Sequence, residues 1–469
     1  MFNKVQYGVG TTNGCEKVIH TLRVGQQLHP DWDLLDLDFM NAYNQIVRLA
    51  TAHGLQQKLP TLLNYFETFY NDKAPLILPD RLTSNIYVLL SEEGAQQGDP
   101  EGSLYFSIGV QSIFEEMDTL AKPGFVMSII DDNNTFGPHD QVVNVLDYIS
   151  NNGPNIGLKL QHDKTKILLG KCTNLSIATE RYKKYQEKLK LSDEQAKKCI
   201  FIHPENCTST EDYEEKSLIY GAKILGSPIG SPQFINNWLI NKVNSLRDQF
   251  IQVSALTQLQ CQYQLISQCL SRKLHYVFRT VPPCYTQSII PLYDQMLQKA
   301  LSENIGCPVS SQAWFQARLG YSDGGFGFGF LQDIQHSAFL ASAVTALPTL
   351  LSLFDFSPTV IENPSQNNTL NNTPYFTEIN QSINYVNSHS LATSSPISIS
   401  TVNELHTNNR QHYLTIRLSA YRSSLYLELP ASPEEKARRL SNLGIETSGF
   451  LRATPREDNN TFFLIIFGK

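Results

Sequence analysis

The chain has 469 residues, of which 41% are hydrophobic and 17% charged, so it is long enough to bury more than one hydrophobic core. Its formal net charge of −7 by itself argues weakly against a protein that binds nucleic acid. No apolar run approaches the ~20 residues of a membrane span, and residues 1–10 lack the charged-then-apolar pattern of a signal peptide.

Cysteine spacing bears on the cellular compartment of the protein, and local charge bears on its possible partners. All eight cysteines lie between Cys15 and Cys307, with no CxxC pair and no histidine cluster at zinc spacing, which predicts reduced thiols in a cytoplasmic or nuclear, not secreted, protein. Residues 158–198 carry eleven Lys or Arg against five Asp or Glu, and residues 231–303 carry six against three. Such a stripe fits either a nucleic-acid track or a solvated helix face, and charge alone leaves both open.

The first hundred residues predict alternating helices and strands. Asn13, with Glu16 three residues later, predicts a capping box that opens a helix over 13–28. The apolar run that ends at Asp38 predicts a buried strand. The remaining elements expected here are helices at 41–54 and 60–70, strands at 75–78 and 84–90, and a loop at 93–100.

A second group of elements follows the loop. A long apolar helix runs to about Met117, and the apolar residues on both sides of Asp131-Asp132-Asn133-Asn134 predict a β-hairpin. A helix at 140–151, a strand at 165–169 and a small hairpin at 219–229 complete the series, while 171–217 is a charged insertion with one helix. The order resembles a split βαβ sheet with helices on one face, an α/β (α+β) fold.

The rest of the chain is predicted to be helical, with one exception. Residues 233–303 read as a helical bundle interrupted at Pro282-Pro283, and another helix covers 333–345. Half of the fifty residues 361–410 are Asn, Ser or Thr, which predicts a poorly ordered spacer. Order resumes at 411–422 and in a helix at 433–443.

Two acidic positions stand at the ends of these predicted strands. An isolated Asp-Asp pair is most simply a turn, but Asp38 ends a neighbouring apolar run in the same way as Asp131. Two carboxylates ~4 Å apart repel by roughly 4 kcal/mol at an effective dielectric near 20, so such a pair implies a bound cation or a raised pKa. Carboxylate oxygens that act on phosphate-bearing substrates favour Mg²⁺.

Five segments in order resemble the motifs of a reverse transcriptase, and more closely those of non-LTR (target-primed) retrotransposons. The segments lie within about residues 5–345 and are Asp38-Phe39-Met40-Asn41-Ala42-Tyr43-Asn44, Glu93-Gly94-Ala95-Gln96-Gln97-Gly98-Asp99-Pro100, Asp131-Asp132, Gly157-Leu158-Lys159-Leu160 with Lys164, and Leu225-Gly226-Ser227-Pro228-Ile229-Gly230. Five motifs in the right order are far more specific than any one of them.

The resemblance implies the palm of a right-hand polymerase and a domain plan. It predicts a remnant of the fingers at 1–30, the palm at 31–230 with the insertion at 171–217, and a helical thumb with its post-thumb connection at 231–345. The spacer would then occupy 346–410 and a small helical segment 411–469. The implied activity is RNA-directed DNA synthesis, with an RNA template, a DNA primer, dNTPs and two Mg²⁺ ions.

The resemblance also implies roles for individual residues. Asp38, Asp131 and Asp132 would be the metal ligands, and Lys164 the general acid for the leaving pyrophosphate. Tyr43 would exclude the ribose 2′-hydroxyl, although an aromatic residue on an amphipathic helix is otherwise a core residue. The remaining implied contacts are Gln97 and Gly98 with the templating base pair, and Leu225 and Gly226 with the primer end.

Several departures from the family pattern leave three alternatives open. Ile129 stands where the family usually has Tyr or Phe, and Glu101 where it usually has Leu. The basic fingers strands before Gln6 and a Cys/His-rich module after Pro455 are expected to be missing, as in an internal piece of a longer polyprotein that extends primers poorly. The alternatives are a polymerase domain, a relic that binds nucleic acid without catalysis, and a maturase-like RNA-binding protein.

Overall fold

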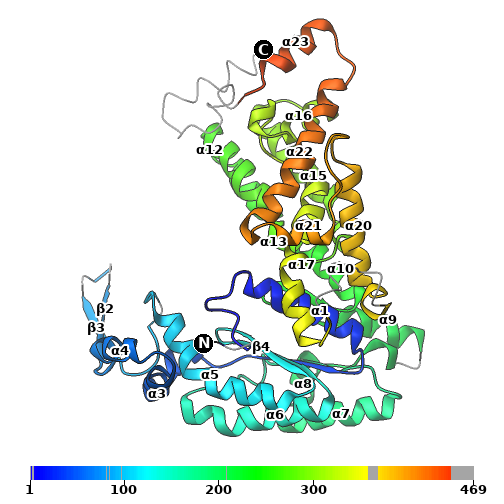
Figure 1. Ribbon diagram of the computed structural model, residues 1–469. Coiled ribbons are helices and arrows are strands. Elements are labelled where there is room, and N and C mark those ends of the chain that lie inside the picture. Colours follow the sequence, from blue (N-terminus) through cyan, green and yellow to red (C-terminus); the bar gives the residue numbers. More distant parts are fainter. Residues whose placement is uncertain are drawn as a thin grey trace. The chain divides into compact units, whose positions relative to one another are not determined.

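The computed structural model describes residue 2 and residues 5–80, 82–83, 85–96, 98–206, 209–357 and 368–444. The chain divides into two compact units, Met1–Phe234 and Ile235–Lys469. The first unit is a mixed α/β arrangement with a small mixed sheet, and the second is helical in its described part (Figure 1). The division falls four residues after the predicted end of the palm at 230.

The first unit is built on a five-stranded sheet of order β4-β5-β1-β6-β7. The strands are β1 (Asp33–Leu37), β4 (Phe125–Ile129), β5 (Asp132–Gly137), β6 (Lys166–Leu168) and β7 (Ile200–Phe201). All neighbours are antiparallel except β6 and β7, which are parallel. The alternation of side chains along β1 sends Leu35 and Leu37 to one face, and Leu34 and Asp36 to the other.

Helices cover both faces of this sheet, whereas the sequence predicted them on one face only. On the face of Leu35 and Leu37 lie α5 (Gly102–Ala121), α6 (His139–Asn152), α7 (Leu175–Lys188) and α8 (Asp193–Cys199). On the opposite side, α1 (Gly14–Leu28) contacts β4 and β9 (Figure 1). The prediction was incomplete because α1 packs on the other side of the sheet, and the second row of alternating strand residues, which includes Leu34 at 0% exposure, is buried as well.

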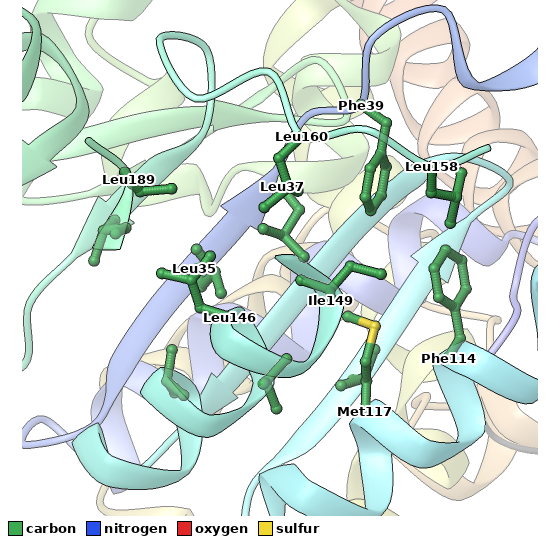
Figure 2. Close-up of a cluster of buried hydrophobic side chains, with 14 of the residues drawn as sticks. Leu35, Leu37, Phe39, Phe114, Met117, Leu146, Ile149, Leu158, Leu160 and Leu189 are labelled. Atoms are coloured by element: carbon green, nitrogen blue, oxygen red, sulfur yellow. The ribbon is translucent and has the colours of Figure 1, made fainter. Parts of the chain in front are cut away.

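The main hydrophobic core lies between the sheet and helices α5 and α6. Figure 2 shows Leu35 and Leu37 of β1 pointing toward Phe114 and Met117 of α5. Leu146 and Ile149 of α6 complete the layer, and Leu158 and Leu160 close it at the end near Phe39. This core therefore fixes the end of β1 from which Asp38 emerges.

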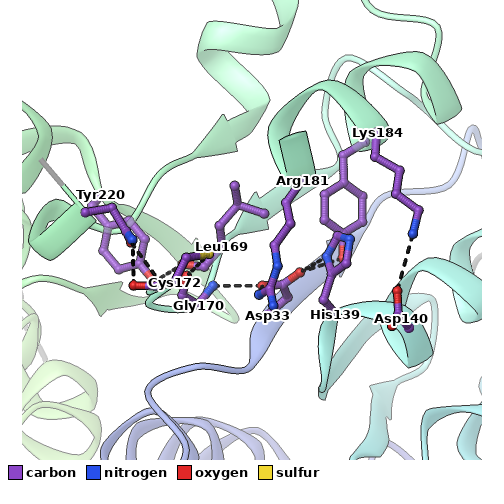
Figure 3. Close-up of polar contacts among 11 residues, drawn as sticks. Asp33, His139, Asp140, Leu169, Gly170, Cys172, Arg181, Lys184 and Tyr220 are labelled. Atoms are coloured by element: carbon purple, nitrogen blue, oxygen red, sulfur yellow. Dashed lines mark hydrogen bonds and ion pairs between the residues drawn. The ribbon is translucent and has the colours of Figure 1, made fainter. Parts of the chain in front are cut away.

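A buried carboxylate anchors the opposite end of β1. Asp33, 0% exposed, accepts hydrogen bonds from the Gly170 amide at 2.8 Å and the Tyr185 hydroxyl at 2.8 Å (Figure 3). His139 Nδ1 lies 2.7 Å from Asp33 Oδ2, and Arg181 Nη1 lies 3.5 Å from Oδ1. One aspartate thus ties β1 to α6, α7 and the end of β6.

Two separate hairpins extend from the first unit. β2 (Ala74–Pro79) pairs with β3 (Ile86–Ser91). Large apolar side chains are exposed on both strands of this hairpin, for example Ile77 at 68% and Val88 at 58%. β8 (Gly221–Ile224) pairs with β9 (Ser227–Gly230) through a two-residue turn. The other helical segments of this unit are α2 (Ala42–Gln45), α3 (Arg48–Lys58), η1 (Pro60–Leu62), α4 (Leu63–Tyr70), η2 (Gly153–Ile156), η3 (Pro204–Asn206) and α9 (Thr210–Ile219).

The second unit packs around the long apolar helix α17 (Leu331–Leu353), which contacts α13, α20, α21 and α22. Its described helices are α10 (Pro232–Asn244), α11 (Arg247–Ser254), α12 (Leu259–Gln264), η4 (Leu265–Cys269), η5 (Leu270–Arg272), α13 (His275–Thr280), α14 (Pro283–Thr286), α15 (Ile290–Ile305), α16 (Ser311–Arg318), η6 (Tyr321–Asp323), α19 (Asn368–Asn371), α20 (Pro374–Ser388), α21 (Ile399–Glu404), η8 (Thr407–Asn409), α22 (Arg410–Glu428) and α23 (Pro433–Ser441). Helix α10 begins in the last residues of the first unit.

Helix α17 is also long and apolar enough to cross a membrane by length and composition, the one such helix in the described ranges. It is not a continuous apolar run in the sequence, because polar residues such as Asp333 and Gln335 interrupt it. In the structure 72% of its apolar stretch is buried by neighbouring helices, as is typical of a core helix.

Three local predictions are wrong, and the first two are the capping box of α1 and the single helix of the insertion. Asn13 adopts a left-handed conformation and its side chain makes no cap hydrogen bond, so α1 has no capping box. The insertion at 171–217 contains α7, α8 and α9 rather than one helix, because its charged residues are the exposed faces of helices that bury Ala178, Tyr185 and Ala196.

The third wrong prediction is the poorly ordered spacer, in the part of 346–410 that the structure describes. Helix α20 lies inside it and buries Tyr375, Phe376 and Ile379. Its Tyr385 hydroxyl donates to Asp333 of α17 at 2.7 Å, and Arg422 of α22 pairs with the same carboxylate at 2.7 Å. The average composition concealed a helical spacing of the few apolar residues. The tail motifs at 445–469 lie outside the described residues.

Candidate active site

The acidic residues meet at one end of the sheet because of the strand register. Leu37 of β1 stands opposite Asn133 of β5, and Asp36 stands opposite Asn134. Continuing this register by one residue brings Asp38 opposite Asp132, with Asp131 in the adjoining turn between β4 and β5. Directly opposed residues of an antiparallel pair share a face, so Asp36, Asp38 and Asp132 lie on the same side.

The charges in this group act on one another. Burial and the charge of Asp131 raise the pKa of Asp132, while burial raises the pKa of Asp38 against the lowering effect of Lys164. Burial, followed by the charges of Asp132 and Asp38, raises the pKa of Asp36 to about 8. Asp36 is therefore part of the same electrostatic cluster as Asp38 and Asp132. We call Asp36, Asp38, Asp131 and Asp132 the acidic edge.

The oxygen donors of the acidic edge suit a hydrated cation, but the side chains do not form a complete coordination site. No group of three His, Cys, Asp or Glu side chains within the described ranges is placed so that it could hold one metal ion. Next to Asp36, however, both polar atoms of the fully buried Asn134 side chain have no hydrogen-bond partner. Mg²⁺ usually keeps several of its water ligands, and such waters would satisfy both the carboxylates and this amide.

The turn that carries Asp131 is held by a residue that the sequence analysis gave no role of its own. Ile130 has φ 58°, a left-handed conformation that is costly for a β-branched residue. The Ile130 amide donates to Gln6 Oε1 at 2.8 Å, and Gln6 Nε2 donates to the Ile130 carbonyl at 3.1 Å. Gln6 is 1% exposed. A Cβ on Gly8 would lie 2.8 Å from the Ile130 nitrogen, so only glycine fits beside this clamp.

Asp38 is positioned by its backbone on the other side of the edge. Its carbonyl accepts a hydrogen bond from the Gln161 amide at 2.8 Å, and the Met40 amide donates to the Lys159 carbonyl at 2.8 Å. The loop 157–165 therefore runs alongside the end of β1. Lys164 on this loop is exposed, and its charge lowers the pKa of Asp38, which places the predicted general acid within electrostatic range of the acidic edge.

Tyr43 is placed by packing on α5. Its ring stacks on Phe106 with centroids 5.4 Å apart, and its hydroxyl lies 3.1 Å from Ser103 Oγ. The ring is half-buried, and after burial the charges of Asp99 and Asp131 raise its pKa. Tyr43 therefore packs on a core helix within electrostatic range of Asp131, and its predicted role beside the ribose stays a prediction.

The glycine loop folds back onto the segment of Tyr43. The Ala95 amide donates to the Tyr43 carbonyl at 2.9 Å, and a Cβ on Gly94 would lie 2.3 Å from the carbonyl carbon of Asn44. Gly98 has φ +99° and open space around it. Gln97 lies outside the described residues, so its predicted contact stays a prediction.

The expected primer-grip residues form the turn of the β8–β9 hairpin. Leu225 has φ 47° and Gly226 φ 82°, the pair of positive angles that a two-residue hairpin turn of this type requires. Arg23 of α1 donates to the Pro228 carbonyl at 2.6 Å and to Ser227 Oγ at 3.1 Å, which fixes the hairpin against α1. The structure leaves a contact of this turn with a primer untested.

Comparisons with known proteins give a distant structural similarity. No family model and no curated protein matches the chain. Among solved structures, a telomerase from Candida albicans, determined in complex with the TWJ fragment of telomeric RNA, is similar with a TM-score of 0.29 and 10% sequence identity over 83% of this chain. The chain spans about half, 52%, of that telomerase chain. A similarity of this size carries no argument about function.

Proposed function

We propose that the first unit is the palm of an RNA-directed DNA polymerase that adds dNTPs to a DNA primer on an RNA template. The observation that supports it is the acidic edge. Two strand ends that are about 90 residues apart in the sequence, at Asp38 and Asp132, are adjacent in the sheet, and burial raises the pKa of both carboxylates. The order of the five sequence motifs supports the templated version of this chemistry.

In this proposal the chain's own residues bind Mg²⁺, position the sugar of the incoming nucleotide and protonate the leaving pyrophosphate. Asp38, Asp131 and Asp132 would hold Mg²⁺, with Asp36 and Asn134 available to its water ligands. Bound Mg²⁺ supplies a lowered pKa for a primer hydroxyl and neutralises the charge of the transferring phosphate. Tyr43 would limit the space beside the sugar, and Lys164, exposed and near Asp38, would donate a proton to the departing pyrophosphate.

A primer-extension assay with matched variants tests the proposal. The purified full chain is incubated with an RNA template, a labelled DNA primer, Mg²⁺ and all four dNTPs. Asp131→Asn should abolish extension, whereas Asp140→Asn, which also removes one carboxylate but lies on the exposed side of α6, should leave it unchanged. Equal extension by the Asp131→Asn variant and the unaltered chain would exclude the acidic edge as the catalytic centre.

A second candidate function is nucleic-acid binding without catalysis, as in a relic or a maturase-like protein. It is favoured by the finding that no three metal-binding side chains in the described part of the chain converge on one point. A gel-shift assay with the same template and primer separates the two functions. Binding that is equal in the unaltered chain and the Asp131→Asn variant, with no extension by either, supports the second candidate.

A further inference from the structure

A polar cavity lies behind the loop that carries Lys164. It has a volume of about 380 Å³ and is formed between the C-terminal ends of α6 and α7 and residues 158–162. This volume is within the range of sites that hold one small molecule, about 300–1,000 Å³. The cavity is contained in the first unit; residues 158–160 of the fourth motif line it, whereas none of the residues given a role in the proposed polymerase chemistry does.

The cavity is cationic. Three lysines line it, Lys159, Lys188 and Lys190, against one carboxylate, Asp147, so the formal charge of its lining is 3 − 1 = +2. Lys188 pairs with Asp147 at 2.6 Å. Lys159 and Lys190 are exposed and have no ion-pair partner in the ranges that the structure describes. Two lysines are therefore available to an anion.

His162 adds a directed polar group. Its Nδ1 lies 2.6 Å from the Leu189 carbonyl. Because a carbonyl oxygen only accepts, Nδ1 carries the proton, and Nε2 of the neutral ring is an acceptor that can take a hydrogen bond from a protonated oxygen of a phosphate group. The same bond joins the end of α7 to the loop 157–165, so both walls of the cavity are connected.

The helix ends set a requirement on the ligand. The last carbonyl groups of α6 and α7 carry partial negative charge and offset part of the lysine charge. A ligand with a single negative charge therefore gains little here, whereas a group with two or more charges close together gains from both free lysines. Phosphate and pyrophosphate groups meet this requirement, and a lone carboxylate does not.

We propose that this cavity is a binding site for a phosphate group, held by Lys159, Lys190 and His162. The site is separate from the acidic edge and does not depend on polymerase activity. Its loop is nevertheless bonded to the end of β1, because the Gln161 amide donates to the Asp38 carbonyl and the Met40 amide to the Lys159 carbonyl, both at 2.8 Å. An occupied cavity would stiffen the loop that presents Lys164.

Isothermal titration of the full chain with inorganic pyrophosphate tests the site. A chelator is included so that no divalent cation binds at the acidic edge. The variant Lys159→Gln with Lys190→Gln should weaken binding about tenfold or more, because two charge-assisted contacts are lost. The control, Lys73→Gln with Lys122→Gln, removes the same charge from exposed positions before β2 and after α5 that do not line the cavity, and should change affinity by less than about twofold. Acetate should not bind measurably.

The outcomes separate the proposal from its alternatives. Equal affinity in the unaltered chain and the cavity variant, or an equal loss in the control variant, would overturn the site and leave only diffuse charge attraction. If the predicted loss is seen, a short single-stranded oligonucleotide is added to the pyrophosphate complex. Displacement of pyrophosphate identifies the phosphate of a nucleic-acid backbone as the ligand, and simultaneous binding identifies a free phosphate compound.

Discussion

At the scale of single residues, the side chains around the acidic edge explain how one turn holds its geometry. The left-handed backbone conformation of Ile130 costs about 1–3 kcal/mol. The side-chain amide of Gln6 offsets this cost because it hydrogen-bonds to both the backbone N–H and the carbonyl of Ile130. Gln6 and Ile130 are 124 positions apart, so sequence patterns gave no signal for the contact. The motif residues could be predicted, but the residue that positions them could not.

Gln6→Ala should disturb the turn that carries Asp131. It leaves the Ile130 amide and carbonyl without their partner, which costs about 1–3 kcal/mol in the free energy of unfolding. The measurement is urea denaturation, combined with Mn²⁺ binding followed by electron paramagnetic resonance. Gln6→Glu keeps the acceptor for the Ile130 amide and serves as a partial control. Unchanged stability and Mn²⁺ affinity in Gln6→Ala would contradict the role assigned to Gln6.

Asp36 predicts a pH dependence of stability whose sign follows from its pKa. The ordinary pKa of an aspartate, 3.8, applies to the unfolded chain, and burial raises the pKa of Asp36 to about 8 in the folded protein, so between these pH values the folded protein holds a proton that the unfolded chain has released. The free energy of unfolding should therefore fall as the pH rises from about 4 to about 8, by up to a few kcal/mol. Asp36→Asn should flatten this slope, with Asp140→Asn as the control. An identical slope in Asp36→Asn and the unaltered chain would rule out a raised pKa.

Tyr43 predicts a selectivity effect in the extension assay. Tyr43→Ala removes the ring that stacks on Phe106 and opens the space near Asp131, so ribonucleotide incorporation should rise by about tenfold or more. Tyr43→Phe keeps the ring, loses only the contact with Ser103, and should discriminate as before. Single-nucleotide extension with dNTP and rNTP measures the ratio. The same ratio in Tyr43→Ala and Tyr43→Phe would make Tyr43 a packing residue only.

At the scale of elements, the apolar runs and turns of the first unit predicted its strands well. β1, β4 and the two small hairpins lie close to where alternation and turn residues indicated, whereas β5 begins at Asp132, so Asn133 and Asn134 are buried strand residues and not the predicted tip of the hairpin. Predictions failed where long-range packing overrides composition. Helix α20 is rich in Asn and Ser yet buries an apolar row against α17, and the charged segment of α7 buries Tyr185 against Asp33. Such partners are determined by the tertiary structure, not by the segment itself.

The Asp33 network predicts a large loss of stability from one substitution. Asp33→Ala leaves the Tyr185 hydroxyl, the Gly170 amide and Arg181 without their shared acceptor in the interior, which should lower the free energy of unfolding by about 3–5 kcal/mol. Asp140→Asn, which breaks only the exposed pair with Lys184, should cost less than about 1 kcal/mol. Urea denaturation followed by far-UV circular dichroism compares them. A loss in Asp33→Ala no larger than the control's would show that the network is not a structural anchor.

At the scale of the whole molecule, the charge is acidic overall and basic in places. The net charge is −7, yet residues 158–198 have eleven basic against five acidic residues, and within them Lys183 and Lys197 are exposed on α7 and α8. An acidic protein that binds nucleic acid through such a stripe must do so by local phosphate contacts, because the rest of the surface repels the backbone. This arrangement makes the salt dependence of binding a measure of how many contacts the stripe provides.

The expected result is a linear fall of the logarithm of the binding constant with the logarithm of the salt concentration. On a primer–template duplex the slope should be about −0.9 for each phosphate contacted. If Lys183 and Lys197 each contact one phosphate, replacing both by Gln should make the slope less steep by about two contacts and weaken binding equally on unrelated sequences. Lys122→Gln, at the end of α5 where Lys122 pairs with Asp118, should leave the slope unchanged. Fluorescence anisotropy over a salt series measures all three proteins. An affinity that does not change with salt, or a slope that the double substitution does not alter, would show that the basic stripe is only a solvated helix face.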